Sequence, residues 1–191
     1  MASISRTLTA KKVMLRARRM LPKPLRRFSR HNRGAAAIEF ALVVIPFIAM
    51  LFAIIETAIV FFATQVLETA VADSARLILT GQAQNGGFNQ ASFKNAVCAR
   101  IGGLFNCSSG IYVDVRTFSD FQSVSMTSPV DSSGNMVNNF VYQPGTAGQI
   151  VVVRLFYQWP IYMQIWNPLI TNMSGNKRLL VATAAFRNEP F

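Results

Sequence analysis

Residues 35–63 read AAAIEFALVVIPFIAMLFAIIETAIVFFA, an apolar stretch interrupted only by Glu39 near its start and Glu56 towards its end. Between Phe40 and Phe62 it holds fifteen Leu, Ile, Val or Phe residues, each of which favours insertion into a bilayer by roughly 0.3 to 0.6 kcal/mol. One off-centre carboxylate opposes insertion by about 3 kcal/mol or less, so the apolar side chains outweigh it. The stretch is longer than a buried core helix needs, and we therefore expect it to cross a membrane as a helix.

Positive charge is confined to the residues before this stretch. The chain of 191 residues has a formal net charge of +11, and eleven cations precede Gly34 with no acidic residue among them. Because a nucleic-acid-binding domain spreads its charge over a folded surface, a basic tail gives little support to nucleic-acid binding. Under the positive-inside rule the tail is expected to be cytoplasmic and the C-terminal residues to lie across the membrane. The cations are Arg6, Lys11, Lys12, Arg16, Arg18, Arg19, Lys23, Arg26, Arg27, Arg30 and Arg33.

Helical character continues beyond the apolar stretch. From Gln65 to Ile78, apolar or small residues recur with a period of about 3.6, and charged residues lie between them. We therefore expect one helix from Ala35 to Thr80 that stops at Gly81 and is bent at Pro46. A cleavable secretory signal, the main alternative for a basic region followed by an apolar one, would have an apolar stretch about half as long.

At the junction of the tail and the apolar stretch the sequence reads Arg33-Gly34-Ala35-Ala36-Ala37-Ile38-Glu39-Phe40-Ala41-Leu42. This segment resembles the class III signal of type IV pilins and pseudopilins, which a prepilin peptidase, an aspartic membrane protease, cuts after a glycine. The resemblance implies a cut between Gly34 and Ala35, so that Glu39 becomes the fifth residue of the mature chain. With Phe40 after the glutamate, and with Ala70–Arg76 beyond the span, the sequence is most similar to the TadE-like pseudopilins of tight-adherence (Flp) pili, which are minor components.

The two glutamates of the apolar stretch have different expected roles. The resemblance implies that Glu39 and Phe40 act in subunit assembly, with Glu39 pairing with the new amine of Ala35 on a neighbouring subunit. The alternative is that Glu39 is a carboxylate at the membrane interface. For Glu56, contact with the outer headgroups and contact with another subunit are equally compatible with the sequence.

The C-terminal residues predict a small α+β domain. A short helix is expected from Asn89 to Ile101, and period-2 alternation predicts strands at Ile111–Phe118, Gln149–Trp159 and Arg178–Arg187. In the first strand Ile111, Val113 and Val115 face one way, and Tyr112, Asp114 and Arg116 face the other. Residues 119–148 should be mostly loop, with a short strand near Phe140–Tyr142. The predicted chain is thus a leader (1–34), a transmembrane and projecting helix (35–81) and an α+β domain with an antiparallel sheet (82–191).

The cysteines, aspartates and aromatic residues outside the span are expected to have structural rather than catalytic roles. Cys98 and Cys107 are expected to form a disulfide rather than to remain free thiols, and two cysteines without nearby histidines cannot complete a zinc shell. The one histidine, His31, lies in the leader, so the outer domain has no histidine base. Asp114, Asp120 and Asp131 are expected to be solvated. The expected aromatic cluster, for core packing or a membrane-proximal contact, comprises Tyr157, Trp159, Tyr162 and Trp166.

The resemblance therefore implies a minor pseudopilin without enzymatic activity, cofactor or small-molecule substrate. Its expected partners are the inner membrane, the prepilin peptidase, other pilins and the pilus assembly platform, with the C-terminal domain in the periplasm. The main alternative is an uncleaved, signal-anchored envelope protein whose outer domain binds a partner. A more distant alternative treats residues 1–33 as a mitochondrial presequence, because they are rich in arginine and lack acids.

Overall fold

The computed structural model describes residues 32–163 and 170–191. Its longest element is helix α3 (Asn32–Leu79), which continues through Pro46 without interruption. Within the described residues this is the one helix long and apolar enough to cross a membrane, judged by length and composition. By its internal contacts the chain divides into two units, one ending at Leu51 and the other running from Phe52 to Phe191.

Helix α3 stops where the sequence predicts, at a glycine. Gly81 has a φ of 77°, in the left-handed region, and its N–H donates to the carbonyl of Ile78 at 3.0 Å. A side chain at this position would also collide with the ring of Phe191. Glycine is therefore required here both by the backbone conformation and by the close approach of the C-terminal residue.

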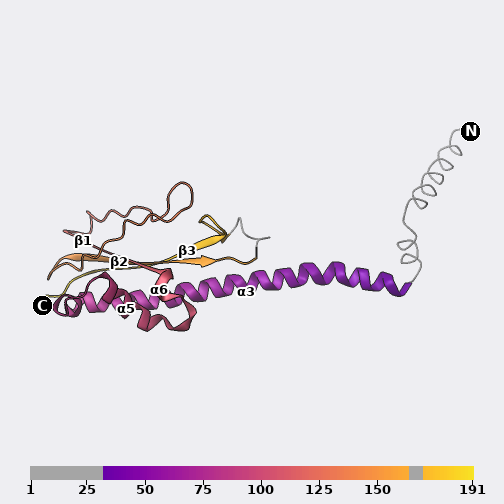
Figure 1. The fold of residues 1–191 in the computed structure, drawn as a ribbon, viewed down its shortest axis with the longest axis horizontal. Coiled ribbons are helices and arrows are strands. Elements are labelled where there is room, and N and C mark those ends of the chain that lie inside the picture. The colour runs from indigo at the N-terminus through magenta and orange to yellow at the C-terminus, as the bar shows by residue number, and fades with distance from the viewer. Residues whose placement is uncertain (1–31, 164–169) are drawn as a thin grey trace, which may run out of the picture. The chain divides into compact units, whose positions relative to one another are not determined.

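Three antiparallel strands form the sheet, in the order β1-β2-β3 (Figure 1). They are β1 (Ile111–Phe118), β2 (Ile150–Pro160) and β3 (Lys177–Arg187), each within one residue of its predicted bounds. The register places Val153 opposite both Val115 and Ala184. The predicted α+β class, a long apolar helix followed by a small antiparallel sheet, is confirmed.

One face of the sheet packs against α3. Strand alternation turns Val113, Val115, Val153 and Leu155 towards the core, as expected for β1, and all of them are buried. The helix contributes one stripe to the same core, and many of its members are small. The stripe consists of Val60, Ala63, Leu67, Ala70, Val71, Ala75 and Ile78.

Short helices connect α3 to the sheet. They are α4 (Gln82–Asn85), α5 (Gln90–Ile101), η1 (Gly102–Leu104) and α6 (Cys107–Gly110). Helix α5 matches the predicted one and begins at a capping box, in which the Asn89 side chain accepts from the Ser92 N–H and Ser92 accepts from the Asn89 N–H. Helix α4 begins directly after Gly81.

The predicted disulfide between Cys98 and Cys107 is confirmed. It ties the last turn of α5 to the first residue of α6, across a short loop. In the chain-entropy model a bridge over so short a loop stabilises the folded state by roughly 2.5 to 3 kcal/mol.

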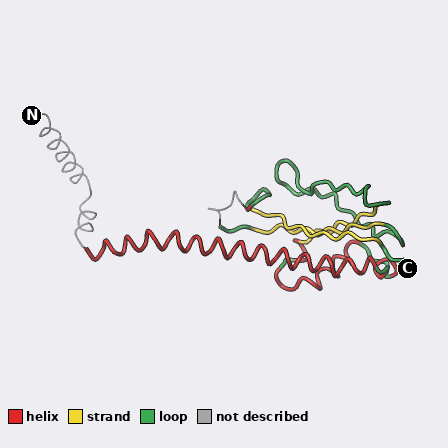
Figure 2. Tube along the Cα trace, turned by 180° about the vertical axis from the view of Figure 1, so that it is seen from behind, coloured by secondary structure: helices red, strands yellow, loops and turns green. Residues whose placement is uncertain are grey.

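The second face of the sheet is covered by residues 119–148, which are mostly loop, as predicted (Figure 2). The Phe140 ring packs between Phe156 and Tyr112, with ring centroids 5.3 and 5.5 Å away. The short strand expected near Phe140–Tyr142 is reduced to a single parallel bridge between Tyr142 and Val115. This bridge closes the free edge of β1, since Val115 donates to the Val141 carbonyl and accepts from the Gln143 N–H.

The predicted cluster of four aromatic side chains is only partly correct. Tyr157 and Trp159 pack edge-on against Phe105, with ring centroids 4.8 and 5.9 Å from its ring. Tyr162 does not join them and is 79% exposed, because the chain leaves the sheet after Pro160. Trp166 lies outside the described residues.

Candidate processing and assembly site

The predicted cut lies at the start of helix α3. The backbone at Gly34 and Ala35 is helical, in the first described turn. A glycine there lowers helix stability by about 1 kcal/mol relative to alanine, and terminal turns fray readily. The described structure does not bear on whether the bond is cut, so Gly34 and Ala35 remain a predicted cleavage site.

Glu39 and Phe40 lie one turn further along an exposed apolar surface. The Phe40 side chain is 69% exposed, and Leu42, Val43 and Ile45 are exposed to a similar degree. Glu39 is exposed and has no hydrogen bond or ion pair with any described residue. A carboxylate among apolar side chains is costly in lipid unless a cation or hydrogen-bond donor accompanies it. If this segment enters a membrane, the partner of Glu39 must come from outside the described chain.

Glu56 differs from Glu39 because the chain itself supplies its partners. Its side chain is 9% exposed, and its Oε1 accepts the Tyr162 N–H at 2.6 Å. The Met163 N–H donates to both carboxylate oxygens, at 3.3 and 3.2 Å. Neither of the two interpretations drawn from the sequence, headgroup contact or contact with another subunit, included this internal partner.

The sequence contained a signal for the burial of Glu56. Within the described residues it is the first buried residue of α3, and the next ones are Val60, Ala63 and Leu67. These positions follow at intervals of four, three and four residues, which places them on one helical face. Glu56 therefore begins the stripe that packs on the sheet, although its polarity suggested an outward-facing position.

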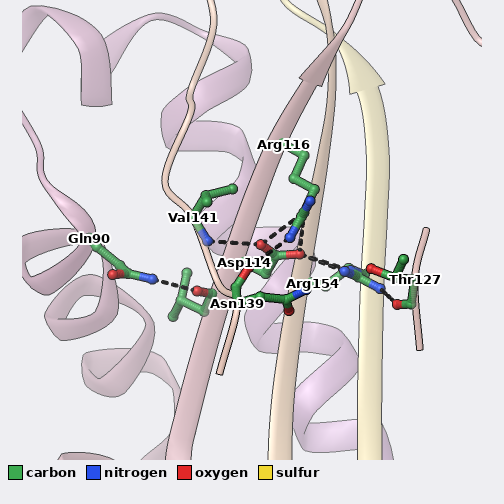
Figure 3. Close-up of polar contacts among 8 residues, drawn as sticks. Gln90, Asp114, Arg116, Thr127, Asn139, Val141 and Arg154 are labelled. Carbon is green, nitrogen blue, oxygen red and sulfur yellow. Dashed lines mark hydrogen bonds and ion pairs between the residues drawn. The ribbon is translucent and has the colours of Figure 1, made fainter. Parts of the chain in front are cut away.

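Asp114 is the largest departure from the sequence analysis, because it is fully buried rather than solvated. The Arg154 guanidinium donates to it at 2.6 and 3.2 Å, and Arg116 Nε donates to both of its oxygens at 3.1 and 3.0 Å (Figure 3). The Val141 N–H donates at 3.0 Å. The predicted alternation of β1 is correct, but the face that Asp114 occupies is covered by residues 119–148.

The two arginines extend this network to the covering loop. Arg154 donates to the Thr127 carbonyl at 3.1 Å, and Arg116 donates to the Asn139 carbonyl at 2.8 Å. Together with the bond from Val141 to Asp114, these contacts attach the loop to the sheet at three places (Figure 3). The network is thus a structural clamp in which both oxygens of Asp114 find their donors within the chain.

The electrostatics of the clamp favour an ionised carboxylate. Burial acts to raise the pKa of Asp114, but the Val141 N–H and the two guanidinium groups outweigh burial, and the pKa lies below its usual value. Asp120 and Asp131 are exposed, as predicted. The Ser123 N–H is the main cause of a lowered pKa at Asp120.

Tyr142 is a buried polar group without a hydrogen-bond partner. Its hydroxyl contacts no donor or acceptor among the described residues, while its ring packs against Phe93 with centroids 5.6 Å apart. Burial raises the pKa of Tyr142 to about 12. Its contribution is therefore apolar packing. Among residues 32–163 and 170–191, no group of three or more His, Cys, Asp or Glu side chains could hold a metal ion.

The similarity of this chain to known proteins lies in helix α3 and does not extend to the sheet. The family model described as TadE-like protein matches residues 34–76. No curated protein and no solved structure matches the chain. The matched segment begins at the glycine of the predicted cut, includes Glu39 and Glu56, and ends near the end of α3. The resemblance noted from the sequence is therefore shown for this segment.

Proposed function

Since residues 34–76 carry the TadE-like segment, we propose that this chain is a minor pseudopilin, cut after Gly34 by a prepilin peptidase. It acts in the assembly or initiation of tight-adherence pili, which attach cells to surfaces. Helix α3 holds it in the bacterial inner membrane, with the basic leader in the cytoplasm and the α+β domain (residues 82–191) in the periplasm. The chain performs no chemistry of its own, and its partners are the peptidase, other pilins and the assembly platform.

The observation that carries this proposal is the state of Glu39. It lies five residues after Gly34, on an exposed apolar helix surface, without a partner among the described residues. A cut after Gly34 would create a cation at Ala35, four residues from Glu39 and thus about one helical turn away. The amine of a neighbouring copy could then neutralise the carboxylate as helices pack together. Such a pair between neighbouring copies would explain why the exposed apolar surface of α3 contains one carboxylate without a partner.

Removal of the leader changes the charge balance of the whole chain. The eleven leader cations account for the net charge of +11, so residues 35–191 are formally neutral. Lys and Arg next to a span fix its position strongly because they resist transfer across lipid. The cut chain keeps only its apolar helix in the bilayer, which lowers the barrier to leaving it for a packed helical bundle.

Recombinant expression with and without a prepilin peptidase tests the proposal, with N-terminal sequencing of the purified chain. We expect a mature chain that begins at Ala35 only when the peptidase is present. Gly34→Leu should abolish the cut, because a peptidase that cuts after glycine approaches the backbone closely and leaves little room for a bulky side chain there. Ala41→Leu is the matched control, since it adds similar bulk seven residues away and should leave the cut unchanged.

An uncleaved envelope protein makes the opposite prediction. It would keep its leader in the presence of the peptidase and would be indifferent to Gly34→Leu. A mature chain that begins at a residue other than Ala35 would also remove the pseudopilin assignment.

A further inference from the structure

We propose that residues 161–163, hereafter the tip loop, form a second membrane contact at the inner limit of the headgroup region of the outer leaflet. Glu56 is the positioning residue that holds this loop against α3. The inference rests on the proposed function only in taking α3 as the membrane span. The inference adds a phospholipid-contacting surface on the unit that contains the sheet (Phe52–Phe191), hereafter the sheet-bearing unit.

The exposed side of α3 indicates where lipid gives way to water. Exposed positions remain apolar from Phe52 as far as Phe61 and Phe62, which are 68% and 62% exposed. The next exposed positions are polar, beginning with Gln65 and Glu68. Exposed apolar side chains belong in lipid and exposed polar ones in water, so the boundary falls between Phe62 and Gln65.

The tip loop lies on the lipid side of this boundary. Glu56 precedes Phe62 by six residues, which is about 9 Å along a helix, and it bonds directly to the Tyr162 N–H at 2.6 Å. Each headgroup region of a bilayer is roughly 5 to 7 Å thick, judged from total and hydrocarbon thickness. Because about 9 Å exceeds this thickness, a loop held at the level of Glu56 on an upright helix lies just below the inner limit of the headgroups.

The backbone of the tip loop is suited to a region poor in water. The Ile161 N–H donates to the Asn176 carbonyl at 2.9 Å, and Glu56 accepts the N–H groups of both Tyr162 and Met163. Three consecutive donors are thus satisfied within the chain. Non-helical backbone at membrane depth requires this, because an unsatisfied group there costs several kcal/mol.

The side chains of this end of the sheet also fit the interface. Tyr162 is 79% exposed although it follows a buried residue and its backbone is held. Tyrosine is enriched at the headgroup level, where its ring meets apolar chains and its hydroxyl meets water. Lys177 lies opposite Pro160 at the start of β3, and its Nζ donates to the Gln158 side chain at 3.0 Å. A lysine side chain at this level can also extend its ammonium group towards a lipid phosphate.

The test uses the full-length chain in phospholipid vesicles, with an environment-sensitive fluorophore attached to Tyr162→Cys. The two native cysteines are paired and leave the new thiol as the one to label. Phe121→Cys is the matched control, because Phe121 is also an exposed aromatic residue but lies in the loop that covers the sheet. We expect nitroxide-bearing lipids to quench the label at 162 and not at 121, and aqueous iodide to quench 162 several-fold less than 121.

A second set of variants tests the role of Glu56. Glu56→Ala should raise iodide quenching at 162 several-fold, while Glu56→Gln, which keeps one acceptor oxygen, should restore most of the protection. Glu68→Ala, an exposed glutamate on the same helix, should change nothing. Equal effects of all three substitutions would remove Glu56 as the positioning residue.

Two outcomes would overturn the membrane contact. One is a label at 162 that iodide quenches as strongly as the label at 121. The other is protection that appears only at high protein density in the vesicles, which would assign the surface to a neighbouring copy. Two further measurements on the same sample distinguish failure of the proposed function from failure of this inference. Flotation of the vesicles tests the membrane span, and N-terminal sequencing tests the cut after Gly34. A chain that fails to float contradicts the membrane span, and a floating chain with an exposed tip loop contradicts this inference alone.

Discussion

Glu39 and Glu56 interrupt the same apolar helix, yet the chain treats them in opposite ways. Glu39 is exposed and has no partner among the described residues, while Glu56 is buried and accepts two backbone N–H groups. The difference lies in what covers the helix. From Glu56 onward one face of α3 packs against the sheet and the short helices that follow it, whereas no described residue of α3 before Glu56 is buried. A charge in an apolar helix is thus satisfied internally where the fold supplies donors, and elsewhere it calls for another molecule.

This contrast predicts that substitutions after Glu56 change the stability of the sheet-bearing unit and that matched substitutions before it do not. The relevant quantity is the free energy of unfolding of the sheet-bearing unit, residues 52–191, in detergent. Urea titration followed by tryptophan fluorescence measures this quantity.

The largest effect is expected from Asp114→Ala. It leaves the buried Arg154 guanidinium without its carboxylate, and breaking a buried pair in this way costs about 3–5 kcal/mol. Asp120→Ala is the control, because Asp120 is exposed and bonds only within its own turn, to Ser119 and Ser123, so it should cause a much smaller loss. Similar losses in both variants would contradict the clamp.

Leu67→Ala comes next and tests the packed part of α3. Leu67 is fully buried against the sheet, and truncation of a buried leucine costs about 2–5 kcal/mol. Leu51→Ala removes the same atoms from a side chain that is 40% exposed and lies before the packed face. It should leave the unfolding of residues 52–191 unchanged. If the two variants behaved alike, the division of α3 at Glu56 would be wrong.

Acid should weaken the same unit through Asp114. The folded-state pKa is lowered relative to the ordinary value of 3.8, so the stabilising contribution is complete above that pH. It is lost as the pH falls from 3.8 through the folded-state pKa, because the unfolded chain binds the proton first. Unfolding measured against pH should show this loss in the wild type and in Asp131→Asn, whose carboxylate is exposed. The loss should be absent from Asp114→Asn.

The smallest effect is expected from Glu56→Gln, which keeps an acceptor but removes the charge. Hydrogen bonds to charged groups are stronger than neutral ones by about 1 kcal/mol, and we expect a loss of that order. Faster hydrogen exchange of the Tyr162 and Met163 amides would report it directly. Glu39→Gln should leave both the unfolding and the exchange unchanged. A stability loss for Glu39→Gln would show that the chain does supply it a partner.

Much of the fold follows from local patterns. The long apolar run predicts α3, and Gly81 predicts its end, because only glycine adopts the left-handed conformation without cost. Alternation of apolar residues predicts all three strands to within one residue, since it reflects the period of two in every strand. The Cys98–Cys107 disulfide and the TadE-like segment were also predictable, because each depends on a few residues close together in sequence.

The partners of the buried charges depend on contacts that are distant in sequence. Asp114 meets Arg154, forty residues away, and Glu56 meets Tyr162, more than a hundred residues away. Alternation correctly placed Asp114 on the second face of the sheet, but no local pattern shows that residues 119–148 cover that face. The helical period predicts a packed face only from Gln65 to Ile78, and it shows neither that Glu56 lies on this face nor which donors lie opposite it.

The sequence by itself determined an apolar helix that continues as an amphipathic one, three strands with alternating apolar residues, and a leader that carries the whole net positive charge. These properties are set by side chains within a few residues of one another. Only the tertiary structure decided which of the acids are exposed and which are held by the chain. The physical reason is that a buried carboxylate is tolerated only where donors converge on it, and such convergence is a property of the packed chain.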